Sequence, residues 1–173
     1  PNMSDQIIKQ VKLINQTFNE SFEKTTFHLN TTWKLYKLEF SNLFSYGENN
    51  VIKFKKYKGV TGIIAPNHMG KSSIIDIILF TIFDKFPRKG NIKDIINNRR
   101  THFKTKLTIQ IDKWKYIIEK SGSKNEKKRV NCKLVFYRIN KDNIKEILNE
   151  ETQSKTKDAI LKYVGSYEDI IQT

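Results

Sequence analysis

The longest apolar run of the chain, IIDIILFTIF at residues 74–83, comes directly after the polar stretch APNHMGKSS at residues 65–73. A run with a single charge is typical of a helix that is covered on most sides, so we expect a helix over residues 72–84 inside a substantial core. The segment before the polar stretch, GVTGIIA at residues 59–65, is apolar and β-branched, and it predicts a buried central strand. The polar stretch therefore joins a predicted strand to a predicted helix.

Strand patterns lie on both sides of this unit. Before it, WKLYKLEF (33–40) and VIKF (51–54) alternate as half-buried strands do, and a turn-rich segment joins them. After it, Pro87 and Gly90 end the helix and open a polar, basic segment at residues 87–100.

Three further strands and a helix are expected in the second half. KTKLTIQI (104–111), WKYIIEK (114–120) and VNCKLVFYR (130–138) predict an antiparallel meander, with a turn at Asp112-Lys113 and a loop at 121–129. A last helix is expected over residues 154–163. Residues 1–32 carry one amphipathic helical stripe and a linker, and we expect them to lie outside a domain at 33–173.

The chain is strongly basic, with 32 Lys and Arg against 18 Asp and Glu and a net charge of +14. Such a charge favours a polyanionic partner such as double-stranded DNA, and the alternative is a solvated lysine-rich surface that follows coding bias. The candidate DNA-contacting residues are Arg88, Lys89, Lys93, Arg99, Arg100, Lys104, Lys106, Lys124, Lys127, Lys128 and Arg129.

The cysteine content indicates the compartment. Cys132 is the single cysteine, which excludes an internal disulfide framework and a CxxC metal site in these residues. With no signal peptide and no apolar run long enough to span a bilayer, the sequence predicts an intracellular protein, cytoplasmic or nuclear, with no membrane contact.

Gly70-Lys71-Ser72 fits the second half of the phosphate-loop pattern G-x-x-x-x-G-K-[ST]. In such a loop, backbone N–H groups at a helix N-terminus point at phosphate oxygens, the lysine reaches the β- and γ-phosphates, and the hydroxyl binds Mg²⁺. Ala65 stands where the pattern has its first glycine, which costs little if its φ is negative. The residues expected to contact ATP are Ala65, Pro66, Asn67, His68, Met69, Gly70, Lys71, Ser72 and Ser73, with Ser72 as the Mg²⁺ ligand.

A longer stretch carries a resemblance. KLEFSNLFSYGENNVIKF followed by GVTGIIAPNHMGKSSIIDIILFTIFD resembles the opening of the SMC-like ATPases, and within them the SbcC type, also called Rad-fifty, in phage or large-DNA-virus members. The positions in register are Asn42, Phe44, Ser45, Tyr46, Asn67, Gly70, Lys71, Ser72, Ser73, Asp76 and Phe83. The resemblance departs at Ala65 and His68, where the family usually has glycine; His68 either contacts phosphate or covers the loop.

The resemblance implies an α/β fold, the N-terminal lobe of an ABC-type ATPase head, with a mixed sheet around a buried helix and an antiparallel three-stranded meander. It also implies a DNA repair ATPase in which ATP and Mg²⁺ clamp two heads together, the dimer binds DNA, and a partner nuclease of the SbcD type is regulated. Lys71 would stabilise the transferring phosphoryl group, and Phe44 and Ser45 would flank the nucleoside.

The family that this chain resembles has further catalytic motifs and a coiled coil, and none of these is found in these residues. We therefore expect a C-terminal lobe, on the same polypeptide or in trans, and an inactive segment without it. Three alternatives stay open: a chromosome-structural SMC or RecF/RecN-like ATPase, a P-loop small-molecule kinase, and a non-hydrolysing binding module with a degenerate loop.

Overall fold

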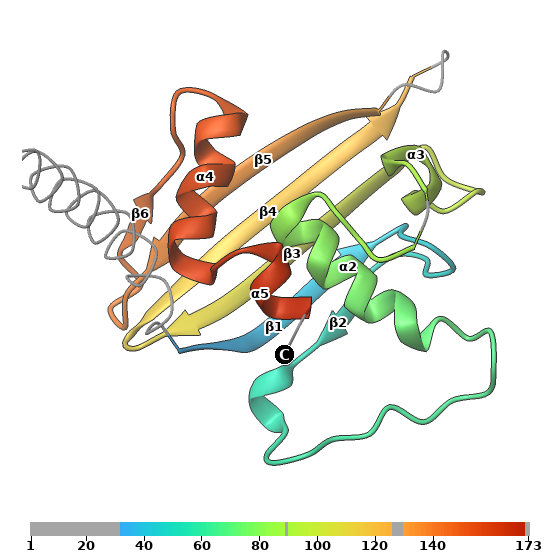
Figure 1. Ribbon diagram of the computed structural model, residues 1–173, viewed down its shortest axis with the longest axis horizontal. Coiled ribbons are helices and arrows are strands. Elements are labelled where there is room, and N and C mark those ends of the chain that lie inside the picture. Colours follow the sequence, from blue (N-terminus) through green and yellow to red (C-terminus); the bar gives the residue numbers. More distant parts are fainter. Residues whose placement is uncertain (1–31, 89, 126–129, 172–173) are drawn as a thin grey trace, which may run out of the picture.

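The computed structural model describes residues 32–88, 90–125 and 130–171. Within these residues, six strands form one sheet in the order β2-β1-β3-β4-β5-β6, and every neighbouring pair is antiparallel (Figure 1). The strands are β1 (Trp33–Ser41), β2 (Asn50–Ile52), β3 (His102–Ile111), β4 (Trp114–Lys124), β5 (Val130–Ile139) and β6 (Lys145–Ile147). The α/β architecture and the β3–β4–β5 meander predicted from the sequence are confirmed.

Helices α2, α4 and α5 lie over one face of this sheet (Figure 1). The helices are α2 (Lys71–Phe83), α3 (Ile92–Ile95), α4 (Gln153–Val164) and α5 (Tyr167–Ile171), with a short 3-10 helix, η1, at Phe54–Lys56. The expected helices at 72–84 and 154–163 match α2 and α4 to within a residue or so at each end. Helices α3 and α5 and strand β6 were not predicted from the sequence.

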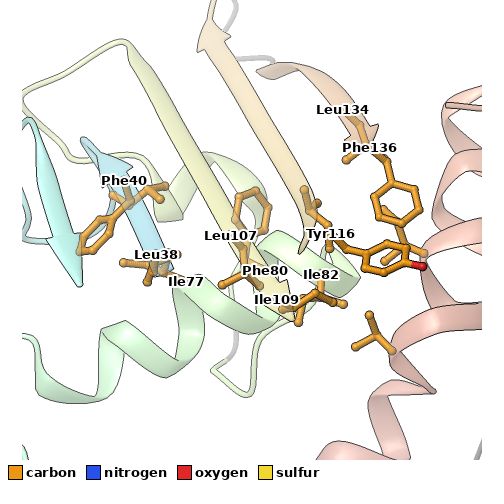
Figure 2. Packing of buried hydrophobic residues seen from close by; sticks show 14 of the residues in the cluster. Leu38, Phe40, Ile77, Phe80, Ile82, Leu107, Ile109, Tyr116, Leu134 and Phe136 are labelled. Atoms are coloured by element: carbon orange, nitrogen blue, oxygen red, sulfur yellow. The ribbon is translucent and has the colours of Figure 1, made fainter. Parts of the chain in front are cut away.

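The core lies between the sheet and helices α2 and α4, and Figure 2 shows part of it. Phe80 and Ile77 of α2 are fully buried against β-strand residues such as Leu38 and Leu107. Phe80 and Phe103 meet edge to face, with ring centroids 5.7 Å apart, a favoured aromatic geometry. The other face of β3 is more polar: Lys104 and Gln110 are exposed on it, as the alternation predicts. The helix over this core is not covered all round, because Ile75 is 58% exposed.

The expected central strand at residues 59–65 is not formed, so this prediction was wrong. The segment has no strand assignment, and Val60, Ile63 and Ile64 are 104%, 56% and 97% exposed. A strand needs a neighbour to accept its backbone hydrogen bonds, and none of the described residues provides one. The mixed sheet expected around α2 is consequently an antiparallel sheet among the described strands.

Two strand boundaries also differ from those expected. The strand predicted over VIKF is shorter, because β2 ends at Ile52 and η1 follows at Phe54. The predicted loop at 121–129 begins later, because Ser121–Lys124 continue β4 and pair with both β3 and β5. Gly122 allows this pairing: a Cβ there would lie 2.5 Å from the Phe103 ring and 2.8 Å from a backbone carbonyl of β5.

Some predictions fall outside the described residues: the helix and linker at residues 1–31, and the DNA-contacting role of Lys89, Lys127, Lys128 and Arg129. Among the helices of the described residues, none combines the length and apolar character needed to cross a membrane.

Candidate nucleotide-binding site

The phosphate loop turns into α2 through a left-handed glycine. Gly70 has φ 83° and is the N-cap of α2, which begins at Lys71. The backbone N–H of Ser73 donates to the carbonyl of Gly70 at 3.0 Å, so the first helical turn closes directly after the loop. The unpaired N–H groups of a first helical turn favour an anion at this end of α2.

The amine of Lys71 is folded back over its own loop. It donates to the carbonyl of Ala65 at 2.6 Å and to that of Pro66 at 2.9 Å. These two hydrogen bonds hold the positive charge against the first two residues of the loop. Phosphate oxygens are stronger acceptors for an ammonium group than carbonyls are, so a phosphate bound at this end of α2 would compete with the two carbonyls for the amine.

Backbone conformation separates the two positions at which the loop lacks glycine. His68 has φ 65°, in the left-handed region where a side chain is disfavoured, whereas Ala65 is not among the residues with positive φ. Alanine at position 65 therefore costs the loop little, and histidine at position 68 carries the strain.

The turn before β2 packs directly on the loop. The hydroxyl of Tyr46 donates to the carbonyl of Gly70 at 3.1 Å, and a Cβ on Gly70 would lie 2.8 Å from Oγ of Ser45. Glycine is thus required at position 70 by its φ and by the lack of space. This contact brings Phe44 and Ser45, 25 or more residues earlier in the chain, beside the loop.

An open hollow of about 560 Å³ lies between these segments, within the usual range for small-molecule sites. The expected nucleotide-contacting residues that line it are Phe44, Ser45, Asn67, His68, Gly70, Lys71, Ser72 and Ser73. Ala65, Pro66 and Met69 are not in the lining; the first two supply the carbonyls that hold Lys71, and Met69 is 62% exposed.

Four lining residues were not expected there: Arg88, Asp94, Ile96 and Asn98. All four come from the basic segment at 87–100, which folds back past the loop. Backbone hydrogen bonds fix this segment, because the N–H of Phe44 donates to the carbonyl of Ile95 at 2.6 Å. The sequence offers one signal for them, the buried Ile95-Ile96 pair inside an otherwise polar stretch.

Arg88, predicted from its charge to contact DNA, lies in this hollow. Its Nε forms an ion pair with Oδ2 of Asp76 at 2.8 Å, and its guanidinium lies 5.8 Å from the Phe44 ring centroid. Burial raises the pKa of Asp76, and the charge of Arg88 only partly offsets the effect. The pair therefore ties α2 to the segment that follows it, beside the phosphate loop.

A protein-family model described as an AAA domain matches residues 37–173. The chain belongs to this AAA domain family. The match begins in β1 and includes the phosphate loop, α2 and the whole meander.

Individual proteins resemble parts of this AAA domain. An uncharacterized protein of Acanthamoeba polyphaga mimivirus is 38% identical over 148 residues, which cover 82% of this chain and 11% of that protein. A solved structure titled as the recombination mediator protein RecF-ATPrS in the RecFOR pathway aligns with a TM-score of 0.50 at 16% identity, over 60% of this chain and 27% of that one. A second RecF structure, titled RecF-ATP, gives a TM-score of 0.49 at 17% identity, over 59% and 28% of the two chains. This chain thus spans about a tenth of its curated relative and about a quarter of the RecF chain, with which it shares a fold.

The side chains in the hollow of this AAA domain suit a nucleotide that carries Mg²⁺. Ser72 is exposed at the start of α2 inside the hollow, and its hydroxyl is a hard oxygen ligand of the kind that Mg²⁺ takes. Among the described residues, no group of three or more His, Cys, Asp and Glu could hold a metal by itself. A Mg²⁺ ion at this site would take its remaining ligands from phosphate and water.

The other predicted DNA-contacting residues do not form one set. Lys104 is exposed on the open face of the sheet, whereas Lys106 on the same face lies 2.9 Å from Glu119 and 3.2 Å from the Tyr137 hydroxyl. Partial burial lowers the pKa of Lys106, but these two partners outweigh it and raise the pKa overall. Lys106 is therefore committed to a local network, while Arg99 and Arg100 are exposed in the turn before β3.

Proposed function

We propose that this chain is the ATP-binding lobe of a DNA repair or recombination ATPase of the SMC-like, SbcC type. The observation that carries the proposal is the Lys71 amine, held over a phosphate loop whose Gly70 is locked against Ser45 and Tyr46. This arrangement places a cation and the N-terminal end of α2 beside one open hollow. In phosphoryl transfer such positioning and charge stabilisation account for most of catalysis, so Lys71 would act on the transferring group and Ser72 on its metal.

The test is a titration of the full-length protein with a fluorescent ATP analogue in the presence of Mg²⁺. Replacement of Lys71 by Ala removes the cation that meets the phosphates, and we expect binding to fall at least tenfold, a loss of about 1.4 kcal/mol. The matched control is Lys113→Ala, an exposed lysine in the turn between β3 and β4. Equal affinities for the wild type and Lys71→Ala would overturn the assignment.

The same proposal includes a C-terminal lobe that completes the site. Support comes from the apolar segment at 59–65, whose exposed Val60 and Ile64 lie in sequence just before the phosphate loop. Exposed apolar residues that are contiguous mark a surface that another element covers. The added lobe would pair a strand with this segment, on the same polypeptide or in trans, and the chain's small share of its relatives' lengths is consistent with this.

Amide hydrogen exchange tests this part. In the full-length protein we expect the amides of residues 60–64 to be protected, and in a fragment of residues 33–173 to exchange at the rate of an open chain. We also expect the full-length protein to hydrolyse ATP and the fragment not to. Steady turnover by the fragment, removed by Lys71→Ala, would instead identify a self-sufficient P-loop enzyme.

ATP-driven dimerisation of two heads and regulation of an SbcD-type nuclease are further parts of the proposal. The RecF-like fold favours one alternative, a RecF-like recombination ATPase, which would have a recombinase-loading partner in place of a nuclease. Metal-dependent cleavage of DNA by the purified complex, gated by ATP, would support the SbcC type; a complex that cleaves no DNA and loads a recombinase would support the RecF type.

A further inference from the structure

A second hollow, of about 670 Å³, lies beside the nucleotide site. It is formed by α3, the turn that follows, and the far end of β4. Its lining residues are Lys93, Asp94, Asn98, Arg100, Thr101, Lys124 and Asn125. Asp94 and Asn98 also line the nucleotide hollow, so the two cavities share a wall.

The charge of this second hollow is positive. Lys93 and Lys124 make no ion pair within 4.0 Å among the described residues, and Arg100 lies 3.5 Å from Glu48 with both side chains about half exposed. Exposed pairs of this kind contribute little and leave the cation available. The carboxylate of Asp94 is committed to its own helix, because its Oδ2 accepts the backbone N–H of Asn91 at 2.8 Å.

The frame around these three cations is built from backbone hydrogen bonds. The N–H of Lys124 donates to the carbonyl of Thr101 at 2.7 Å, and that of Arg100 to the carbonyl of Asn97 at 2.9 Å. The N–H of Asn97 in turn donates to the carbonyl of Asn42 at 2.9 Å. Segments from three parts of the chain are therefore fixed around the hollow, and the cations do not depend on a loose loop for their placement.

We propose that the hollow of Lys93, Arg100 and Lys124 binds the phosphate backbone of DNA, directly beside the nucleotide. The inference rests on the proposed function, and it narrows the DNA surface from a dispersed set of basic residues to one built site. An open, basic hollow without apolar lining residues suits a long polyanion, and contacts of this kind position the duplex without reading its sequence. The hydroxyl of Thr101 and the amide of Asn98 add neutral donors for phosphate oxygens.

The experiment compares two triple variants of the full-length protein. Lys93→Gln, Arg100→Gln and Lys124→Gln together remove the three cations of the hollow. The matched control removes the same charge from three exposed lysines, by Lys34→Gln, Lys113→Gln and Lys141→Gln. These residues lie at the opposite end of the strands from the hollow; Lys34, for example, pairs with Gln110 near the end of β3. Fluorescence anisotropy with a 20-base-pair DNA duplex, at graded salt concentrations, gives affinity and salt dependence for each protein.

We expect the hollow variant to bind the duplex at least tenfold more weakly and to lose roughly 2–3 from the slope of log K against log salt, because each phosphate contact contributes about 0.9. The control variant should keep the wild-type slope to within about 1. Equal losses in both variants, or no loss in the hollow variant, would overturn the proposal. The single variant Lys93→Gln, at an exposed position, repeats the measurement with the least disturbance of the fold.

Two further arms identify the ligand. Polyglutamate that displaces the duplex as well as DNA does, charge for charge, would overturn the proposal in favour of an acidic protein partner. An RNA duplex that binds more tightly than the DNA duplex would overturn the choice of DNA. The ATP analogue is titrated into the same proteins, and the hollow variant should keep the wild-type nucleotide affinity. A wild-type protein that binds no analogue would count against the proposed function alone.

Discussion

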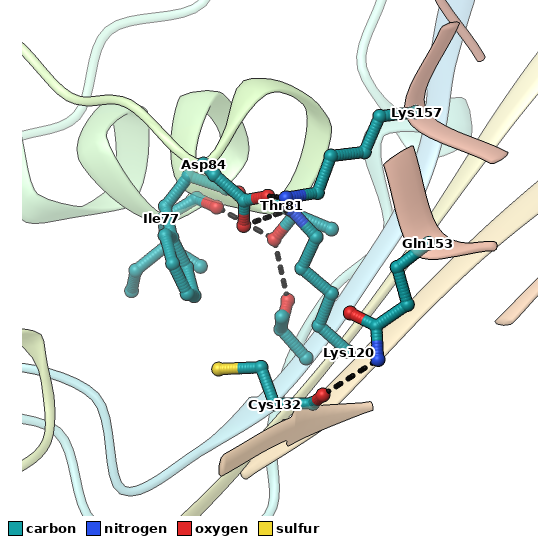
Figure 3. Close-up of polar contacts among 9 residues, drawn as sticks. Ile77, Thr81, Asp84, Lys120, Cys132, Gln153 and Lys157 are labelled. Atoms are coloured by element: carbon teal, nitrogen blue, oxygen red, sulfur yellow. Dashed lines mark hydrogen bonds and ion pairs between the residues drawn. The ribbon is translucent and has the colours of Figure 1, made fainter. Parts of the chain in front are cut away.

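The amine of Lys120, a side chain only 1% exposed, lies 2.6 Å from Oδ1 of Asp84, the residue that ends α2. The same amine donates to the carbonyl of Phe80 at 2.8 Å, and Oδ2 of Asp84 lies 2.7 Å from Nζ of Lys157 on α4 (Figure 3). One buried lysine of β4 thus closes the C-terminal end of the phosphate-loop helix and connects it to α4. A positive charge at this end also complements the helix dipole.

Removal of this lysine should destabilise the lobe. Lys120→Met keeps the side-chain volume but leaves the Phe80 carbonyl without this donor and Asp84 without its closest cation, and we expect unfolding free energy to fall by roughly 3 kcal/mol. The control is Lys157→Met, whose half-exposed side chain should contribute less than about 1 kcal/mol. Urea unfolding measures both, and equal losses would show that Lys120 has no special place in the fold.

Acid should weaken the same contact. Burial alone would raise the pKa of Asp84, but Lys120 and Lys157 outweigh it, and the pKa lies below its usual value. A carboxyl whose pKa is lower in the folded state contributes stability above its unfolded pKa, about 3.9, and loses it as the pH falls through the folded value. We therefore expect stability to fall as the pH drops from about 4, with a shallower slope in Asp84→Asn. Unfolding midpoints at pH 5, 4 and 3 measure this, and parallel curves for the two proteins would contradict it.

Gly70→Ala should abolish nucleotide binding through two separable effects. The left-handed φ costs about 1–2 kcal/mol for any L-side chain, and the new Cβ meets Oγ of Ser45. The double variant Gly70→Ala with Ser45→Ala relieves only the contact, so it should recover part of the stability lost by the single variant. Thermal unfolding and analogue titration on both variants and on Ser45→Ala alone measure the two contributions; no recovery would mean that conformation alone excludes alanine.

His68→Gly separates the two roles open to this histidine. If His68 only covers the loop, glycine at φ 65° relieves strain of about 1 kcal/mol, and analogue affinity stays the same or rises several-fold. Affinity that falls tenfold would identify a phosphate contact. The matched control is Ala65→Gly, whose backbone has no positive φ to relieve and which should leave affinity within about twofold.

Local pattern accounts for what could be predicted of the fold and the site. The alternation of β3, the apolar run of α2 and the Gly70-Lys71-Ser72 turn depend on residues that are neighbours in sequence, and the structure has each of them close to where it was expected. The alternation of β4 also indicates that Lys120 is buried, because it places Lys120 on the same face as Tyr116 and Ile118.

Partners distant in sequence were decided only by the tertiary structure. Nothing local pairs Lys120 with Asp84, turns Arg88 into the nucleotide hollow, or sets Asn97 against Asn42, because these contacts form only when separate elements pack. The segment at 59–65 shows that local propensity alone is not sufficient. Its residues have the propensity of a strand, but a strand exists only where a neighbour accepts its hydrogen bonds. The sequence by itself determined which elements this protein is built from, and the packing of those elements determined which residues surround the phosphate loop.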